Sequence, residues 1–205
     1  MKDLVVLVAD SQQEAVINTL LEERYRSLGI RQLQKEQNFA IYAHPNRDPG
    51  VYGEASQFLS LYLNQFTYAL VLLDAEWKGS PGASQIKEKV QTSLNQNGWS
   101  NRSATIVIEP ELEIWVWSSS DVVPNVLGKS WDEIRNIAQQ KNYWQQEAIK
   151  PHRPKELMEE VLRQARKHPS ANLFINLAKK VSLVRCEDAA FQELKERLQE
   201  WFPPQ

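Results

Sequence analysis

Acidic side chains follow three segments of the chain that read as buried β-strands, two at each place. Carboxylate oxygens are the hard ligands that Mg²⁺ and Mn²⁺ prefer, with coordination positions left over for water and phosphate. Carboxylates crowded without a cation repel one another and take up protons, so a divalent metal ion is their natural counter-charge. Such an ion would suit phosphoryl transfer or phosphodiester hydrolysis. The pairs are Asp10 and Glu14 after residues 4–9, Asp74 and Glu76 after residues 68–73, and Glu111 and Glu113 after residues 104–108.

Each pair also has an ordinary structural explanation, because loops beyond strands are solvated and acids are common there. Asp10 or Ser11 can cap the helix that follows, while Glu14 in its first turn suits the helix dipole. Glu111 and Glu113 share a face only where the backbone is extended. Three pairs at successive strand ends still favour a site. We predict Asp10, Glu14, Asp74 and Glu76 as metal ligands and Glu111 and Glu113 as catalytic residues.

A polar, turn-rich segment, residues 44–50, follows a further strand candidate and offers two more catalytic residues. We expect it to be a loop that forms a wall of the site. His44 could serve as a general base or bind phosphate, and Asp48 lies four residues beyond it. A histidine in such a loop is more often simply solvated. The chain has no Gly-x-Gly-x-x-Gly, Walker or Gly-x-Ser-x-Gly motif, so nucleotide-cofactor binding and serine hydrolysis have no support.

The elements that must position these residues alternate between strand and helix. Short apolar, β-rich runs predict strands, and stretches with apolar residues at helical spacing lie between them. This order predicts an α/β fold with a mostly parallel sheet flanked by helices. Sites in open parallel sheets form beyond the C-terminal ends of the strands, so the acids should converge. The predicted strands are 4–9, 39–43, 68–73 and 104–108, and the helices between them are 11–28, 54–66 and 84–95.

The chain becomes helical beyond Gly128. Ser130 and Glu133 have the spacing of a capping box, and three amphipathic helices are predicted further on. Residues 114–117 could be a short helix or an edge strand. We expect an α/β core in residues 1–128 and a helical C-terminal extension, residues 129–205, packed on it as one domain overall. The three amphipathic helices are 155–168, 171–181 and 187–201.

Composition limits the functions that the chain can have. With 205 residues and 42% hydrophobic content, it has the size and make-up of one globular domain. A net charge of −2 argues against binding to DNA by bulk electrostatics. The sequence still allows a local basic groove, because basic residues gather in the C-terminal part. Such residues more often simply make a helix surface soluble. They are Lys150, His152, Arg153, Lys155, Arg163, Arg166, Lys167 and His168.

The cysteine content and the N-terminus indicate the environment of the protein. Cys186 is the only cysteine, which excludes an intramolecular disulfide, and we expect it to be a buried small hydrophobe. The apolar run 4–9 is too short for a signal peptide, and no other run is long enough to span a membrane. We therefore expect a cytoplasmic protein without a membrane partner.

The acidic motifs resemble the Toprim fold of primases, topoisomerases and OLD-family nucleases. In that fold a Glu-Gly-x-x-Asp/Glu element follows the first strand and an Asp-x-Asp element follows a later one. Here residues 10–14 stand in the first place and residues 74–76 in the second. The chain more closely resembles small Toprim-like bacterial proteins of phage-defence and restriction-modification loci, through residues 48–50, residues 69–76 with Gly79, and residues 108–117.

The resemblance implies a Toprim-like, Rossmann-like core and a Mg²⁺- or Mn²⁺-dependent nuclease or related phosphotransfer enzyme of antiviral defence. Its implied partners are nucleic acid and other defence proteins. The chain departs from the pattern, because Asp10 and Ser11 replace Glu-Gly and Glu76 replaces the second aspartate. Without the glycine, close approach of the backbone to a substrate phosphate is in doubt. The alternative function is therefore that of a non-catalytic interaction or sensor subunit. Exposed aromatic side chains would then hold the partner, among them Trp115, Trp117, Trp131, Tyr143 and Trp144.

Overall fold

The computed structural model describes residues 1–117, 120–183 and 186–204. Its centre is a four-stranded parallel sheet with the strand order β2-β1-β3-β4. The predicted α/β class is confirmed, and every strand pair in this sheet is parallel. The strands are β1 (Lys2–Val8), β2 (Phe39–Ala43), β3 (Phe66–Asp74) and β4 (Ser103–Ile108).

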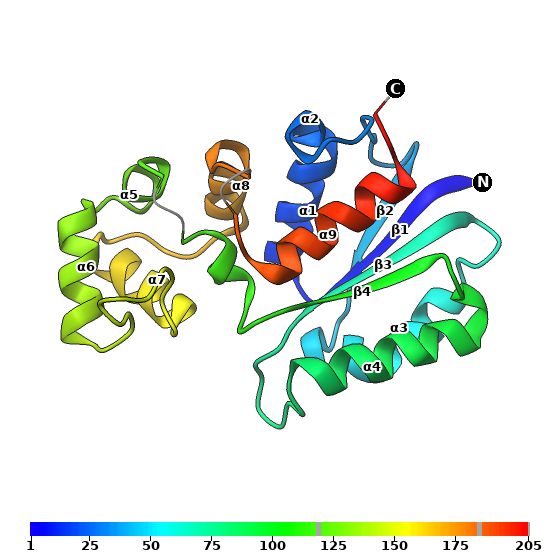
Figure 1. Ribbon diagram of the computed structural model, residues 1–205, viewed down its shortest axis with the longest axis horizontal. Helices are drawn as coiled ribbons and strands as arrows, with labels where there is room; N and C mark the ends of the chain where they lie inside the picture. The colour runs from blue at the N-terminus through cyan, green and yellow to red at the C-terminus, as the bar shows by residue number, and fades with distance from the viewer. Residues whose placement is uncertain (118–119, 184–185, 205) are drawn as a thin grey trace.

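Helices cover both faces of the sheet (Figure 1). Successive strand residues point to opposite faces, so Leu4 and Val6 join one apolar core while Val5 and Leu7 join the other. Both faces are buried, which explains the continuous apolar runs in the strand sequences. One face carries α1 (Ser11–Glu23), α2 (Tyr25–Leu28), α8 (Ala171–Lys180) and α9 (Ala189–Trp201), and the other carries α3 (Arg47–Ser60) and α4 (Ala83–Leu94).

A lobe of three helices lies beyond the C-terminal ends of the strands, at the left in Figure 1. Trp117 and Trp144 pack edge to face inside it, and the predicted capping box of Ser130 and Glu133 is confirmed. The single turn η2 (Leu112–Trp115), a 3₁₀ helix, leads from β4 toward this lobe, so the ambiguous segment 114–117 begins as a short helix and is not an edge strand. The lobe consists of α5 (Val122–Leu127), α6 (Trp131–Gln140) and α7 (Pro154–Gln164).

The strand order creates a switch point between β1 and β3. The chain leaves β1 through α1 to reach β2 on one side, then crosses back through α3 to reach β3 on the other side of β1. Successive connections therefore diverge between β1 and β3, at the C-terminal ends of these two strands. In open parallel sheets, ligands bind beyond the strand ends at such a switch point.

Two helix boundaries differ from the predictions. The predicted helix 11–28 is interrupted at Arg24, whose backbone leaves the helical region, and the short α2 then ends at Gly29 with a left-handed φ of 73°. The predicted loop 44–50 is wrong beyond Asn46, because α3 already begins at Arg47. Pro49 is tolerated in that first turn, where backbone N–H groups have no partner within the helix. Asp48 thus lies on a helix and not on a loop.

The α3 helix also ends earlier than predicted, at Ser60, so that Phe66 begins β3. The η1 segment (Asn95–Trp99) is a π-type turn that follows α4 and leads toward β4. No helix in the described part of the chain is long and apolar enough to cross a membrane.

The expected exposure of the aromatic side chains is wrong for three tryptophans. Trp115, Trp117 and Trp144 are only 8%, 1% and 5% exposed, and Trp131 and Tyr143 are partly buried against the same core. Large aromatic rings bury much apolar area and fill the space between the sheet and the helical lobe. Cys186 is buried, as predicted.

Candidate functional site

Asp74, the last residue of β3, stands at the switch point of the sheet. Its Oδ1 atom accepts hydrogen bonds from Gln13 Nε2 at 2.9 Å and from the Leu112 backbone N–H at 3.1 Å. Gln13 is buried, and its Oε1 atom accepts a hydrogen bond from the Ala9 backbone N–H at 3.0 Å. The Asp74 carboxylate is therefore fixed by groups that follow β1 and β4.

Asp48 joins this arrangement from the first turn of α3. Its Oδ1 atom accepts a hydrogen bond from the Asp74 backbone N–H at 2.8 Å. Burial raises the pKa of the Asp48 carboxyl, and the negative charge of Asp10 adds to that effect. The early start of α3 is what brings Asp48 to the end of β3.

Asp10 caps α1, as the sequence suggested. Its Oδ1 atom accepts hydrogen bonds from the backbone N–H groups of Gln12 at 2.8 Å and Gln13 at 3.0 Å. Glu14 is held apart, because its Oε1 atom lies 3.2 Å from Lys35 Nζ. Metal ligation by Glu14 would require that ion pair to open.

Glu111 and Glu113 enter from the segment after β4 and are only 8% and 5% exposed. Glu111 Oε2 lies 3.3 Å from Lys155 Nζ, at the start of α7. That contact goes to Glu111 alone, and no described side chain donates a hydrogen bond to the Glu113 carboxylate. Burial, followed by the charge of Glu111, raises the pKa of Glu113 to about 7.

These five acids form the carboxylate cluster: Asp10, Asp48, Asp74, Glu111 and Glu113. Burial raises the pKa of Asp74 well above its ordinary value, and the charges of the other four acids raise it further. Burial also raises the pKa of Glu111, although the ammonium group of Lys155 opposes this shift. Burial is the largest cause of each of these pKa shifts and neighbouring carboxylates add to it, so the cluster favours binding of protons or of a cation.

Glu76 and His44 lie at the margins of this arrangement. Glu76 is exposed and lines an open hollow together with Glu109, Glu111 and Lys155. His44 is buried against α3, and its Nδ1 atom accepts a hydrogen bond from the Asn46 backbone N–H at 3.1 Å.

The far side of the His44 ring faces Glu54, with 3.4 Å between Nε2 and Oε2. Gly50 packs directly against the ring, because a Cβ atom added there would lie 2.1 Å from Nδ1. His44 therefore supports the start of α3, which carries Asp48.

The donor set of the cluster matches a hard divalent cation, since every donor is a carboxylate oxygen. Among the described residues, no group of three or more His, Cys, Asp or Glu side chains is placed to hold a metal ion by itself. An all-protein cage is thus absent from that part of the chain. Mg²⁺ commonly binds through one or two carboxylates and completes its shell with water and substrate phosphate. The buried carboxylate of Glu113, to which no described side chain donates, fits such a site.

Sequence reasoning missed two residues of the site. Gln13 follows the cap residue Asp10 by three positions, and only the strand order shows that its amide reaches Asp74. Lys155 belongs to the basic residues of the C-terminal part in the sequence, yet its side chain contacts Glu111. Neither contact has a local sequence signal, because each joins residues more than 40 positions apart.

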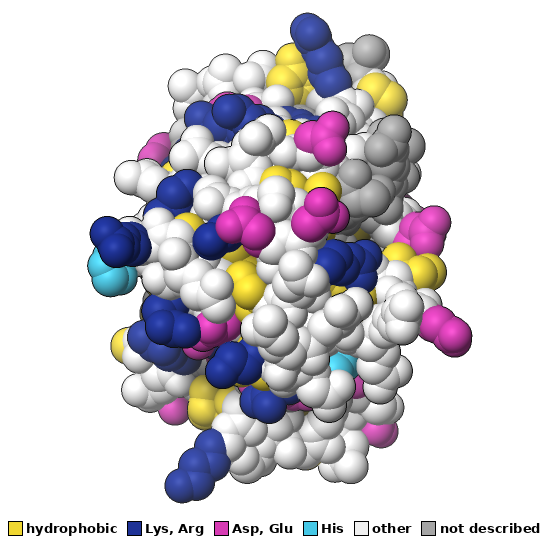
Figure 2. Space-filling view, turned by 90° about the vertical axis from the view of Figure 1, so that its left-hand side faces the viewer, with side chains coloured by type: hydrophobic (Ala, Val, Ile, Leu, Met, Phe, Trp, Pro, Cys, Tyr) yellow, Lys and Arg dark blue, Asp and Glu magenta, His cyan; other side chains and the backbone are white. Residues whose placement is uncertain are grey.

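A second hollow adjoins the first along α7. It is lined by Glu159, which also lines the hollow beside Glu111, and by basic residues at the C-terminal end of the helix. Figure 2 shows Lys and Arg side chains over this end of the molecule, with Asp and Glu between them. The surface is thus mixed in charge, and several of its basic residues line this second hollow. Its basic residues are Arg163, Arg166, Lys167 and His168.

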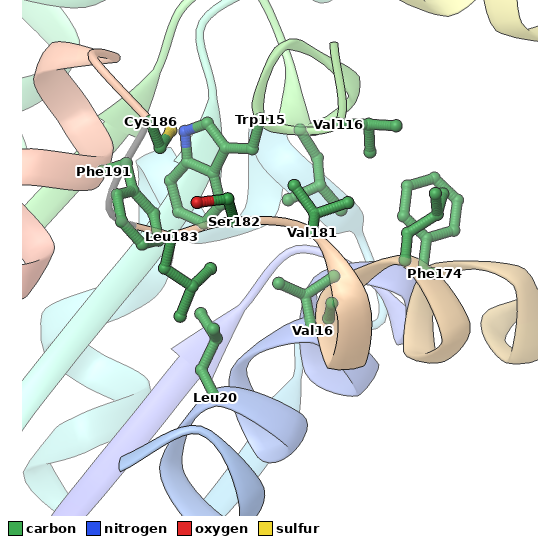
Figure 3. Close-up of a pocket in the computed structure, with 13 residues that line it drawn as sticks. Val16, Leu20, Trp115, Val116, Phe174, Val181, Ser182, Leu183, Cys186 and Phe191 are labelled. Atoms are coloured by element: carbon green, nitrogen blue, oxygen red, sulfur yellow. The ribbon is translucent and has the colours of Figure 1, made fainter. Parts of the chain in front are cut away.

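A separate apolar cavity of about 40 Å³ lies between α1, α8, α9 and η2 (Figure 3). Side chains of Val16, Leu20, Trp115 and Phe191 surround it. Ser182 supplies the one hydroxyl among the described residues around this cavity, and its other lining residues are apolar apart from Cys186, so a cavity this small is poorly suited to orienting a substrate. The carboxylate cluster is the better candidate site.

Comparisons with protein-family models, with curated proteins and with solved structures find no match to this chain. The functional assignment of the carboxylate cluster therefore depends on its own geometry and electrostatics.

Proposed function

We propose that the carboxylate cluster binds Mg²⁺ or Mn²⁺ and that the protein is a metal-dependent nuclease or a related phosphotransfer enzyme of the Toprim type. The observation that carries this proposal is the place of Asp74. It lies at the switch point between β1 and β3, with acidic side chains from three other segments around it. The resemblance to Toprim proteins adds a role in bacterial antiviral defence, with nucleic acid and other defence proteins as partners.

The residues of the cluster divide into ligands and a proton acceptor. Asp10 and Asp74 would hold the metal ion, which supplies a polarised water and neutralises charge on phosphate. Gln13 keeps the Asp74 carboxylate in place through its hydrogen bond. Glu113 is suited to take a proton from water, because a group with a pKa of about 7 can act as a base near neutral pH.

The basic hollow beside the site supports a nucleic-acid substrate. Arg163 lies on α7 eight residues beyond Lys155, which corresponds to roughly 12 Å along the helix, and Arg166 follows after the helix ends. Phosphates in one strand of a duplex repeat about every 3.4 Å along its axis. A strand that runs along α7 with its scissile phosphate at the cluster would therefore place a phosphate roughly three to four nucleotides away near this hollow.

A cleavage assay tests the proposal. Single-stranded DNA, double-stranded DNA and RNA are incubated with the protein and Mg²⁺ or Mn²⁺, alongside Asp74→Asn and the exposed control Glu200→Gln. We expect cleavage that needs the metal, is lost in Asp74→Asn by a factor of at least about 100, and is kept in Glu200→Gln. Equal cleavage by Asp74→Asn would overturn the assignment of the site.

A second candidate is a non-catalytic interaction or sensor subunit. Two observations favour it: the described residues hold no preassembled metal cage, and the Asp10 side chain is already engaged in capping α1. This candidate predicts no metal-dependent cleavage and no Mn²⁺ binding, with or without nucleic acid. It also predicts a stable complex with a protein encoded beside it, which co-expression and size-exclusion chromatography would detect.

A further inference from the structure

Lys155 is placed as a counter-ion of the carboxylate cluster. Among the described residues it is the only Lys or Arg whose side chain contacts a carboxylate of the cluster, with 3.3 Å between its Nζ atom and Glu111 Oε2. Burial lowers its pKa, but the charges of Glu111 and Glu113 and the hydrogen bond to Glu111 outweigh burial, so that the net pKa is raised. The acids of the cluster therefore favour the charged form of the ammonium group.

The backbone of Lys155 is anchored, while its side chain is half exposed at the edge of a hollow. Pro154 is buried at the start of α7, and its carbonyl oxygen accepts a hydrogen bond from Trp117 Nε1 at 3.0 Å. The Lys155 side chain is 48% exposed and lines the open hollow beside Glu76. Its long, flexible stem can thus move the ammonium group between Glu111 and a ligand in the hollow.

A lysine in this place has two consequences for the site. A unit positive charge beside Glu111 repels a second cation, so it weakens the binding of a divalent metal ion. The same charge attracts a phosphate that approaches from the hollow, because Lys is a point-charge binder of phosphate. These effects have opposite signs and can be measured separately.

We propose that Lys155 is a tethered counter-ion that holds Glu111 in the metal-free protein and binds the substrate phosphate once a metal ion occupies the cluster. This inference rests on the proposed function of the cluster as a metal site. It assigns Lys155, on the helical lobe, a direct part in binding the group on which the metal acts.

The first test is calorimetric titration of Mn²⁺ into the full-length protein and into Lys155→Met, Lys155→Gln and Lys155→Arg. We expect Lys155→Met and Lys155→Gln to bind Mn²⁺ about three- to tenfold more tightly, because one part-exposed charge acts through a dielectric between those of protein and water. Lys155→Arg keeps the charge and should stay within about twofold of the wild type.

A matched control removes a different positive charge from the same segment. Arg153 lies two residues before Lys155 and forms its ion pair with Glu156, outside the cluster. Arg153→Met should change the affinity for Mn²⁺ by less than about twofold. An equal gain in Arg153→Met and Lys155→Met would contradict a specific role of Lys155, since it would reflect net charge alone.

The second test uses inorganic phosphate as the probe, at saturating Mn²⁺. Lys155→Met should bind phosphate at least about fivefold more weakly than the wild type, while it binds Mn²⁺ more tightly. Unchanged or weaker Mn²⁺ binding in Lys155→Met, or unchanged phosphate binding, overturns the role of Lys155 and leaves the metal site standing. Absence of Mn²⁺ binding by the wild type overturns the metal site itself.

Discussion

The side-chain amide of Gln13 donates a hydrogen bond from Nε2 to Asp74 Oδ1 over 2.9 Å and thereby bridges the switch point between β1 and β3. The same side chain accepts a hydrogen bond from the Ala9 backbone N–H through Oε1. One buried amide thus fixes both the end of β1 and the acid at the centre of the site. Removal of the Gln13 amide should therefore lower both the stability of the fold and the affinity of the site for a metal ion.

Gln13→Leu keeps the apolar bulk but leaves the buried Ala9 N–H and the Asp74 carboxylate without this partner. We expect the free energy of unfolding to fall by about 1–3 kcal/mol, because an unsatisfied buried donor loses its hydration without compensation. Urea denaturation measures this change. Gln12→Leu, one residue earlier and partly exposed, is the control and should cost less than about 0.5 kcal/mol.

The raised pKa of Glu113 makes stability depend on pH. The pKa of Glu113 is about 7 in the folded protein, whereas its ordinary value is 4.5. Between these two pH values the folded state therefore binds more protons than the unfolded state. Stability should therefore fall as the pH rises from about 4.5 through about 7. We expect Glu113→Gln to be more stable than the wild type at pH 8, on the order of 2–3 kcal/mol, and the gain to vanish near pH 4.

Thermal unfolding of both proteins across this pH range checks the prediction. A wild type that is as stable at pH 8 as Glu113→Gln would show that the charge on Glu113 is not costly in the folded state. Addition of Mn²⁺ should narrow the difference in stability at pH 8. The charged Glu113 of the wild type attracts the cation, and a ligand stabilises the folded state more when it binds that state more tightly.

Gly50 should tolerate no side chain, because a Cβ atom there would lie 2.1 Å from His44 Nδ1. Gly50→Ala must displace His44 or the first turn of α3, and with it Asp48. We expect a loss of about 1–3 kcal/mol in the free energy of unfolding. Gly53→Ala in the same helix meets no atom within 4 Å and should instead gain up to about 1 kcal/mol from helix propensity. Equal effects of the two changes would contradict the packing of Gly50 on His44.

The basic hollow predicts a defect in nucleic-acid binding. Arg166 and His168 line it, and replacing both with alanine should weaken binding of a labelled oligonucleotide at 50 mM salt by about threefold or more. The slope of log affinity against log salt should become shallower by about one for the lost arginine contact. Lys195→Ala, on α9, is a control for charge alone. Fluorescence anisotropy across a salt series distinguishes these outcomes.

The layered fold could be predicted from the sequence because its signals are local. The apolar runs of β1 and β3 are continuous, since both faces of the sheet are covered, and Asp10 caps α1 where the strand ends. The start of α3 was missed because Pro49 and Gly50 read as turn residues, whereas the first helical turn accepts proline and Gly50 makes room for His44.

The candidate site could be predicted only in part. Carboxylates at strand ends pointed to Asp10, Asp74 and the segment after β4, because the ends of parallel strands share one edge. Which acids face each other depends on strand order and on η2, and no local pattern encodes these. The contact of Lys155 with Glu111 joins the helical lobe to the sheet and follows only from the tertiary packing of α7.

The most direct test of the central claim is calorimetric titration of Mn²⁺ into the wild-type protein and into Asp74→Asn at pH 7.5. The account predicts saturable binding to the wild type and a loss of affinity of at least about tenfold in Asp74→Asn, because the substitution removes the central negative charge of the cluster. Equal affinities of the two proteins, or no binding to the wild type with and without an oligonucleotide, would contradict it.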